Sequence, residues 1–407
     1  MTAISPFIDG VAGFQAAGVA AGLKKDGALD MALVLSESDC VAAGVFTRNK
    51  VKAAPVLLDM QRLADNPACI RAVVTNSACA NACTGAVGIE NARNTAQLAA
   101  AALAVSAEQV LVMSTGVIGA HLPMQAIARG IDLSSAALSD DWAAAAAAIM
   151  TTDTRPKLAS VQVECAGGSC TIAGIAKGAG MIAPDMATML SLVVTDAALG
   201  QADLQHALRS ATQQSFNRIV VDGDTSTNDT VLLLANGKSG IQIEDADDRA
   251  AFQEALDALT RYLAQAIVRD GEGVTKFVTL DIIKAATVAD AERIGQTIGA
   301  SLLTKSAFYG SDANWGRIVA AAGRAGTAFD PDRSSLWVTA GESPSEPGLL
   351  IFAGGMPADY QEADAAAIMS APAMTFTLDC GLGLGSATIW TCDISHDYIS
   401  INGDYRS

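Results

Sequence analysis

The chain carries few of the side chains that usually perform hydrolytic or transfer chemistry. Histidine, the commonest general base, occurs three times in 407 residues, at His121, His206 and His396. His206 lies among apolar residues of an expected helix, and His396 lies in the polar segment 393–397, where structural hydrogen bonding is the simpler interpretation. A nucleophilic enzyme built from this sequence therefore needs another base.

The familiar catalytic and ligand-binding motifs are absent. The sequence has no GxGxxG, no GxxxxGK[ST], no HExxH and no GxSxG. The eight cysteines form neither a CxxC pair nor a zinc-type spacing, which favours reduced thiols and argues against a metal centre. The segment 222–229 alternates oxygen-bearing side chains as a calcium loop does, but Thr227 stands where that loop needs glycine and Leu233 where it needs glutamate. We interpret this segment as a hydrogen-bonded turn.

One segment could supply its own base. When a chain is cut directly before a Thr, Ser or Cys, the new α-amino group has a pKa of about 7.7–8.0, whereas that of a lysine is about 10.4. The segment 177–190 has features suited to such a cut, because Gly178 and Gly180 permit close backbone approach and Ala187 presents an unhindered carbonyl to Thr188. On spacing alone, an ordinary loop is the alternative interpretation.

The elements that must position this segment alternate between alanine-rich helices and β-branched strands, which predicts a mixed α/β or α+β protein. Helices are expected at residues 91–104, 139–150, 204–214, 247–270 and 290–306, each near a capping Ser, Asp or Asn. Strands are expected at residues 72–75, 109–114, 160–165, 190–195, 230–235, 279–283 and 349–352. The pattern of residue types changes near residues 280–290, which predicts a main domain at 1–283 and a smaller α+β domain at 284–396.

Composition and charge exclude several classes of protein. There are 43 acidic and 26 basic residues, a formal charge of −17, and no basic stripe interrupts the acidic surface. Such a surface repels phosphate backbones, so we expect no nucleic-acid partner. The most apolar stretches, such as residues 98–112, are broken by polar residues before they reach spanning length. The first 27 residues lack the basic region of a secretion signal, so we expect a cytoplasmic protein that does not enter a membrane.

Several longer motifs occur in a fixed order along essentially the whole chain. They are Thr75-Asn-Ser77, Ser114-Thr-Gly-Val-Ile-Gly119, Thr151-Thr-Asp-Thr154, residues 177–190, residues 215–229, Asp270-Gly-Glu-Gly273, residues 311–317, residues 390–398 and residues 401–407. In these motifs the sequence closely resembles the ornithine acetyltransferase family, also called glutamate N-acetyltransferase, of arginine biosynthesis. The resemblance implies layered sheets flanked by helices around an N-terminal nucleophile threonine, with a smaller α+β C-terminal domain.

The resemblance also implies an activity. The precursor would cleave itself between Ala187 and Thr188 into an α chain of residues 1–187 and a β chain of residues 188–407. Thr188 would then take the acetyl group from N2-acetyl-L-ornithine and pass it to L-glutamate in a ping-pong reaction. No cofactor or metal is implied, acetyl-CoA stays open as a second donor, and the family's usual assembly is two α and two β chains.

The roles of the other site residues follow from the same resemblance, position by position. Thr115 and Gly116 match the oxyanion hole, which stabilises the tetrahedral intermediate. The family's substrate-binding positions correspond to Thr151, Lys177, Thr188, Glu272, Asn402 and Ser407. Lys177 suits a substrate carboxylate and Glu272 a substrate amino group, Thr152 is the alternative to Thr151, and the tail 397–407 is expected to return to the active site.

The sequence departs from the family's pattern beside Asn76-Ser77, where Ala78-Cys79 replaces a Gly-Asn pair. If that glycine serves a positive φ angle, the loop must differ here. Cys79 is either a reactive thiol near the site or, as we favour, a small buried hydrophobe. Two other functions stay open as alternatives: an amidase or aminopeptidase of the same self-cleaving architecture, and an uncleaved ligand-binding protein.

Overall fold

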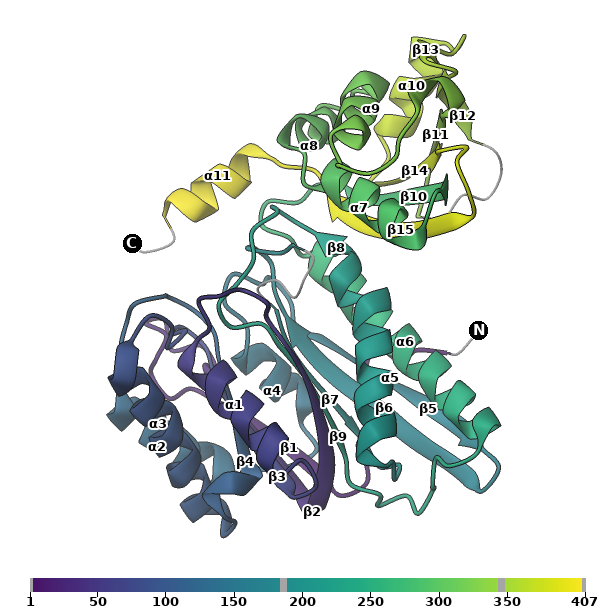
Figure 1. Cartoon of the computed structure of the whole chain (residues 1–407). Helices are drawn as coiled ribbons and strands as arrows, with labels where there is room; N and C mark the ends of the chain where they lie inside the picture. The colour runs from purple at the N-terminus through teal and green to yellow at the C-terminus, as the bar shows by residue number, and fades with distance from the viewer. Residues whose placement is uncertain (1–2, 184–188, 343–347, 405–407) are drawn as a thin grey trace. The chain divides into compact units, whose positions relative to one another are not determined.

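The structure is a computed structural model that describes residues 3–183, 189–342 and 348–404. Three expected site residues, Ala187, Thr188 and Ser407, lie outside these ranges. The chain divides into two compact units, coloured along the chain in Figure 1. Unit 1 comprises Met1–Gly178, Asp185–Asn217 and Thr225–Ile267, and unit 2 comprises Ala179–Pro184, Arg218–Asp224 and Val268–Ser407.

Unit 1 is built on a mixed sheet with the strand order β4-β3-β2-β9-β7-β6-β5, and β1 pairs with β2. The strands are β1 Phe14–Val19, β2 Met31–Phe46, β3 Ile70–Asn76, β4 Val110–Ser114, β5 Lys157–Cys165, β6 Gly168–Lys177, β7 Leu190–Thr195 and β9 Thr230–Ala235. Every residue of β7 and β9 is buried, and these two strands run parallel side by side. Their uninterrupted apolar sequences are typical of strands covered on both faces.

Helices cover both faces of this sheet (Figure 1). They are α1 Ala54–Asp65, α2 Gly85–Leu103, α3 Met124–Ala136, α4 Trp142–Ala148, α5 Gln201–Gln214 and α6 Ala246–Arg269. Alternate residues of β2 face opposite ways, so Leu33 packs in the core formed with α1, α2 and α3, whereas Val34 packs with α4. In β6, Gly174 leaves room for Leu263 of α6, because a Cβ at this glycine would lie 3.2 Å from the leucine Cδ1.

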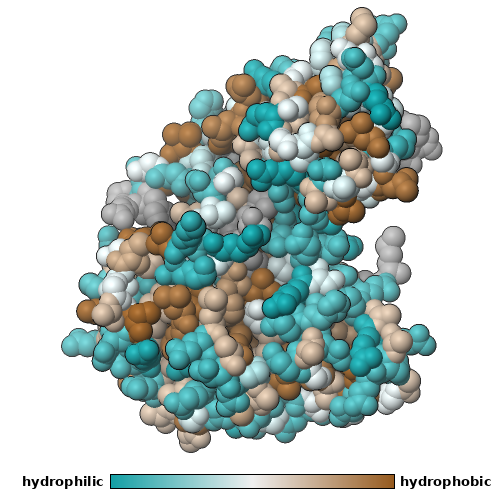
Figure 2. All heavy atoms as spheres, viewed as in Figure 1, coloured by the Kyte–Doolittle hydropathy of each residue, from teal (hydrophilic) through white to brown (hydrophobic). Residues whose placement is uncertain are grey.

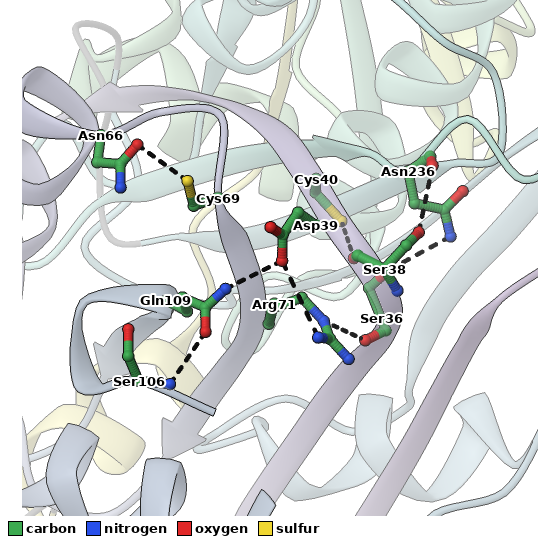
Figure 3. Close-up of polar contacts among 10 residues, drawn as sticks. All are labelled: Ser36, Ser38, Asp39, Cys40, Asn66, Cys69, Arg71, Ser106, Gln109 and Asn236. Atoms are coloured by element: carbon green, nitrogen blue, oxygen red, sulfur yellow. Dashed lines mark hydrogen bonds and ion pairs between the residues drawn. The ribbon is translucent and has the colours of Figure 1, made fainter. Parts of the chain in front are cut away.

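Strand β2 serves both halves of the sheet because its pairing partner changes along its length. Its N-terminal part pairs with β3, with a register shift between Leu35 and Cys40, and its C-terminal part, Val41–Phe46, pairs with β9 in an unbroken register. Polar contacts hold the irregular middle of the strand (Figure 3): Arg71 Nε donates to the Ser36 carbonyl oxygen at 2.8 Å, and the Gln109 amide donates to Asp39 at 2.9 Å. These contacts satisfy polar groups where the regular ladder is interrupted.

Unit 2 has its own mixed sheet, with the strand order β13-β12-β11-β14-β10-β15-β8. The strands are β8 Ile219–Val220, β10 Phe277–Ala285, β11 Ser335–Ala340, β12 Leu349–Ala353, β13 Met356–Pro357, β14 Ala373–Asp379 and β15 Gly385–Cys392. The helices are α7 Val288–Gly299, α8 Leu302–Tyr309, α9 Trp315–Gly323, α10 Glu362–Met369 and α11 His396–Gly403. The core of this unit joins Leu280 and Ile282 of β10 to Ile294 and Ile298 of α7.

Two sequence-based expectations differ from these elements. The domain boundary placed between residues 283 and 284 falls inside β10, within unit 2. The single helix expected at residues 290–306 is two helices, because α7 ends at Gly299 and α8 begins after Ser301. Glycine is a poor helix former and serine a favoured helix start, which explains the break.

The described residues show neither a membrane helix nor a metal cluster. No helix among them is long and apolar enough to cross a membrane. Nor do three or more His, Cys, Asp or Glu side chains converge there in a way that could hold a metal ion. On the face seen in Figure 2, hydrophobic residues are interspersed with hydrophilic ones.

Candidate functional site

Lys177 is the last residue of β6, and its ammonium group lies inside unit 1. Its side chain is 2% exposed, and Nζ donates a hydrogen bond to Thr151 Oγ1 at 2.9 Å. A lone lysine is usually solvated, so this burial is a specific feature of the fold. The structure thus places two expected substrate-binding residues side by side, and the hydroxyl beside the ammonium belongs to Thr151.

Asp153 is the anion that organises these groups, and the sequence analysis assigned it no role. Its side chain is fully buried: Oδ1 accepts from Lys157 Nζ at 2.6 Å and from Gly178 N at 2.7 Å, and Oδ2 accepts from Thr151 N at 3.1 Å and lies 3.8 Å from Lys177 Nζ. Burial alone would raise the pKa of Asp153, but the two ammonium groups and the Gly178 hydrogen bond outweigh it and lower the pKa below its usual range. We call Asp153, Lys157 and Lys177 the lysine cluster.

The proposed oxyanion residues follow directly after β4, in a tight turn. The Thr115 N–H donates to the Asn76 carbonyl oxygen at 3.0 Å. Gly116 has φ +131°, and a Cβ there would lie 2.2 Å from the Ala78 carbonyl carbon, so only glycine fits. Because the Thr115 N–H is engaged, the donors that this turn can offer to an oxyanion are the Thr115 hydroxyl and the Gly116 N–H.

The loop against which Gly116 packs concentrates unusual backbone geometry. Ala78 has φ +71°, and Asn81 and Cys83 also have positive φ. The position where the family's pattern has glycine therefore requires the left-handed conformation, and the alanine adopts it at a cost of about 1–2 kcal/mol. Ala78 itself takes the positive φ angle that a glycine at this position would permit.

Cys79 is a packed thiol in this loop. It is 6% exposed, and Sγ donates to the Ala120 carbonyl oxygen at 3.3 Å. Burial raises the pKa of the thiol above its ordinary value, which disfavours the reactive thiolate. These features favour the second interpretation of the sequence, a small buried hydrophobe.

Asn228 and Asp229 connect the Gly116 turn to the start of β7, and the sequence analysis missed both. The Asn228 amide donates to the Ser114 carbonyl oxygen at 2.8 Å and to the Ala80 carbonyl oxygen at 2.7 Å. The next residue, Asp229, accepts through Oδ1 from Met189 N at 2.9 Å. Since Met189 N is the atom bonded to Thr188, this dipeptide ties the proposed oxyanion turn to the residue after the proposed nucleophile.

The second oxygen of Asp229 is unusual. It is buried and has no hydrogen-bond partner among the residues that the structure describes. Burial raises the pKa of Asp229 well above its ordinary value despite the hydrogen bond from Met189. An acid directly before the apolar strand 230–235 was a signal available in the sequence.

In unit 2, Glu272 lies in a buried turn after α6. It is 7% exposed, its N–H donates to the Ala179 carbonyl oxygen at 3.0 Å, and its Oε2 accepts from the Asn402 amide at 2.7 Å. A Cβ on Gly180 would lie 2.3 Å from Glu272 Oε2, so the absence of a side chain at Gly180 leaves room for the carboxylate. Glu272 is therefore not an exposed turn carboxylate, and two expected substrate-binding residues, Glu272 and Asn402, are in contact.

A second acid, Asp222, also holds helix α11 in unit 2. It accepts from Met181 N at 2.5 Å, from Ile182 N at 2.8 Å and from the Tyr398 hydroxyl at 3.2 Å. Burial, and next the charge of Asp222, raise the pKa of Tyr398. Helix α11 is thus attached through Tyr398 to Asp222 and through Asn402 to Glu272.

Comparison with known proteins gives the family of this chain. The model of the ArgJ family matches residues 15–407. The chain is 48% identical to the arginine biosynthesis bifunctional protein ArgJ of Symbiobacterium thermophilum, over 97% of each chain, and 48% identical to that of Geobacter sulfurreducens, over 98% of this chain and 100% of the relative. A solved structure of an ornithine acetyltransferase from Mycobacterium tuberculosis, complexed with ornithine, is 45% identical over 45% of this chain and 98% of that chain, with a TM-score of 0.42. The chain therefore belongs to the ArgJ family of arginine-biosynthesis acyltransferases.

Proposed function

We propose that this enzyme transfers the acetyl group from N2-acetyl-L-ornithine to L-glutamate, after cleaving itself between Ala187 and Thr188. The observation that carries the proposal is the Asn228–Asp229 pair, which holds the Gly116 turn and the amide directly after Thr188 within unit 1. Such a connection suits a nucleophile and an oxyanion hole that must act on one carbonyl group.

Self-cleavage begins with attack of the Thr188 hydroxyl oxygen on the Ala187 carbonyl carbon. The new C–O bond forms, the C–N bond breaks, and the hydroxyl proton ends on the nitrogen, which becomes the α-amino group of Thr188. Water then hydrolyses the ester and releases the Ala187 carboxylate. The free amino group, with a pKa near neutrality, is the base that three scattered histidines do not supply.

Acetyl transfer uses the same hydroxyl twice. Thr188 attacks the acetyl carbonyl of N-acetylornithine, the tetrahedral oxyanion accepts hydrogen bonds from the Thr115 hydroxyl and the Gly116 N–H, and ornithine leaves with the proton. The amino group of glutamate then attacks the acetyl ester and regenerates the hydroxyl. Lys177 and Thr151 suit the substrate carboxylate, and Glu272 with Asn402 suits a substrate ammonium group.

Intact-mass analysis tests the cleavage. We expect the purified protein to consist of two separate chains, one ending at Ala187 and the other beginning at Thr188. A Thr188→Ala variant should stay one inactive chain of 41.5 kDa. A fully active wild-type protein that remains a single chain would contradict the proposal and favour an uncleaved protein.

The acceptor separates transfer from hydrolysis. Ornithine release from N-acetylornithine should depend on glutamate, whereas release at the same rate without glutamate would favour the alternative, an amidase or aminopeptidase of the same architecture. The relatives are named bifunctional, so we also propose acetyl-CoA as a second donor to glutamate. Formation of N-acetylglutamate from acetyl-CoA by the purified enzyme would establish that activity.

We further propose a cytoplasmic assembly of two α and two β chains. Native mass spectrometry tests its composition, since an α2β2 complex has twice the mass of the 41.5 kDa precursor. A species of one α and one β chain at working concentration would contradict it.

A further inference from the structure

A pocket of about 500 Å³ lies in unit 1, where the C-terminal end of β2 meets α1 and α5. Ligand pockets of proteins commonly have volumes in this range. Its lining consists of residues 44–48 together with Lys52, Met60 and Arg209. None of these lining residues is acidic, although the chain as a whole has 43 acidic and only 26 basic residues. We call this the basic pocket.

Two other pockets of unit 1 differ from the basic pocket in the charge of their linings. One, between α5 and α6, contains Asp203 and Arg249, which form an ion pair at 3.1 Å. The other, along α6, contains the acids Glu254 and Asp257 beside Arg261. Both of these linings present carboxylates to a ligand, which repel an anion. The described lining of the basic pocket presents only cationic and neutral groups, so it favours an anion.

Lys52 and Arg209 are the cations that a ligand in the basic pocket would meet. Lys52 Nζ donates to the Asn49 carbonyl oxygen at 2.8 Å, which orients the ammonium group and leaves it two further donors. Arg209 is exposed on α5, and in the described part of the chain neither residue has an acidic side chain within ion-pair distance. Arg48 also lines the pocket, and it has an interaction of its own. Lys52 and Arg209 can therefore donate charge-assisted hydrogen bonds to a phosphate group.

The basic pocket lies at the edge of the sheet where β7 begins. In the strand registers, Phe46 pairs with Thr230 of β9, and Thr230 pairs with Leu190 of β7. Neighbouring strands are about 4.8 Å apart, so Phe46 lies on the order of 10 Å from Leu190. Leu190 follows the proposed nucleophile Thr188 by two residues, which span at most about 7 Å. A long ligand anchored in the pocket can therefore reach the segment that carries this threonine.

We propose that the basic pocket binds the phosphate groups of acetyl-CoA, the second acetyl donor, through Lys52 and Arg209. The proposal rests on the proposed function, since the acetyl group passes to the same Thr188. The flexible pantetheine arm of the donor carries the thioester from the pocket toward the start of β7. The Thr188 hydroxyl oxygen then bonds to the acetyl carbon, the C–S bond breaks, and coenzyme A leaves as a thiol with the hydroxyl proton. N-acetylornithine has no phosphate and does not use this pocket.

Two thioester donors test the proposal. S-acetylpantetheine has the reacting group of acetyl-CoA without its phosphates. Lys52→Met and Arg209→Met should each raise KM for acetyl-CoA about tenfold, because each removes a charged donor to phosphate. KM for S-acetylpantetheine and for N-acetylornithine should change by less than about twofold, and the unchanged reaction with N-acetylornithine shows that the variants are folded. Equal increases in KM for both thioesters would overturn the proposal.

Calorimetry with coenzyme A, which cannot donate an acetyl group, separates binding from turnover. The wild-type enzyme should bind coenzyme A, and its affinity should fall as ionic strength rises because salt screens exposed charges. Each variant should bind coenzyme A about tenfold more weakly, and inorganic pyrophosphate should compete with coenzyme A on the wild type. A wild-type enzyme that does not bind coenzyme A, or variants that bind it equally well, would overturn the proposal.

The matched control is Arg93→Met, which removes an exposed arginine of α2 that does not line the basic pocket. It should leave KM for acetyl-CoA unchanged, and an increase equal to that of Arg209→Met would overturn the proposal in favour of general surface charge. If Lys52 and Arg209 bind coenzyme A but acetyl-CoA gives no N-acetylglutamate, the second donor activity fails and the pocket assignment stands. If N-acetylglutamate forms and both variants keep the wild-type KM, the pocket assignment fails and the activity stands.

Discussion

The two groups of site residues differ in charge and in the way the fold holds them. In unit 1, the lysine cluster is basic, at most 2% exposed, and fixed at the ends of two paired strands. In unit 2, Glu272 and Asp222 are acidic and are contacted by the short helix α11, from which Asn402 and Tyr398 donate. The two regions therefore have opposite polarities, one basic and one acidic, and each belongs to its own unit.

Because the fold holds the two groups of residues differently, we expect substitutions in the two groups to differ in the size of their effects. Groups fixed inside a sheet have already lost their conformational freedom, and removal of one leaves others buried without partners. A carboxylate held by an exposed helix near the chain end can be rehydrated when a partner is lost. Substitutions in unit 1 should therefore have larger effects than chemically similar substitutions in unit 2.

The largest effect is expected for Gly116→Ala. Its Cβ would overlap the Ala78 carbonyl and displace the N–H that we assign to the oxyanion hole, so kcat should fall about 10²–10³-fold. Steady-state kinetics with N-acetylornithine and glutamate measures this. Gly119→Ala is the matched control, because Gly119 also has positive φ but no atom within 4 Å of its Cβ position. Equal losses in both variants would contradict the role of Gly116.

Lys177→Met should reduce kcat/KM about a hundredfold, since it removes a buried charge that we propose binds a substrate carboxylate. The loss should be much smaller for a substrate whose carboxylate is replaced by an amide. If the amide substrate loses as much as the acid, Lys177 does not recognise the carboxylate.

Glu272→Gln should reduce kcat/KM about tenfold, because glutamine keeps an acceptor for Asn402 but loses the charge for a substrate ammonium group. The same assay, run in parallel with Lys177→Met, compares the two regions directly. A larger loss for Glu272→Gln than for Lys177→Met would reverse our ranking of them.

Asp229→Asn tests the buried acid through the pH dependence of stability. Because the folded-state pKa of Asp229 is raised, the unfolded state loses its proton first, and the native protein is progressively destabilised as pH rises from the ordinary pKa toward the raised one. Asparagine keeps an acceptor for Met189 and does not ionise. The melting temperature of the variant relative to wild type should therefore increase between pH 5 and pH 8, and a pH-independent difference would contradict the shift.

The smallest effect is expected for Ala78→Gly, which should increase the free energy of unfolding by about 0.5–1 kcal/mol. Relief of the left-handed strain outweighs the greater backbone freedom of glycine in the unfolded chain. Denaturant unfolding checks this. Ala80→Gly, two residues away and buried, is the control and should be destabilising.

Local sequence signals predicted the central strands well and the irregular ones poorly. Strands were expected at residues 190–195 and 230–235, where the structure has β7 and β9. Short apolar runs bounded by polar residues are typical of buried strands. β2 was not expected, since the polar residues Ser36–Asp39 interrupt its pattern where the strand changes partners. That interruption depends on contacts with Arg71 and Gln109, which no local pattern reveals.

The sequence by itself determined the resemblance to the family, the order of the motifs and the apolar run 190–195 that follows Thr188 and Met189, because these depend on residue types at short spacing. Only the tertiary structure decided which polar groups meet. The register of the β5–β6 hairpin brings Lys157 beside Lys177, Asp153 contacts both lysines, and Glu272 contacts Asn402 across a sequence separation of 130 residues. Burial and charge balance belong to such long-range contacts, and they turn a lysine that would ordinarily be solvated into a buried cation beside a carboxylate.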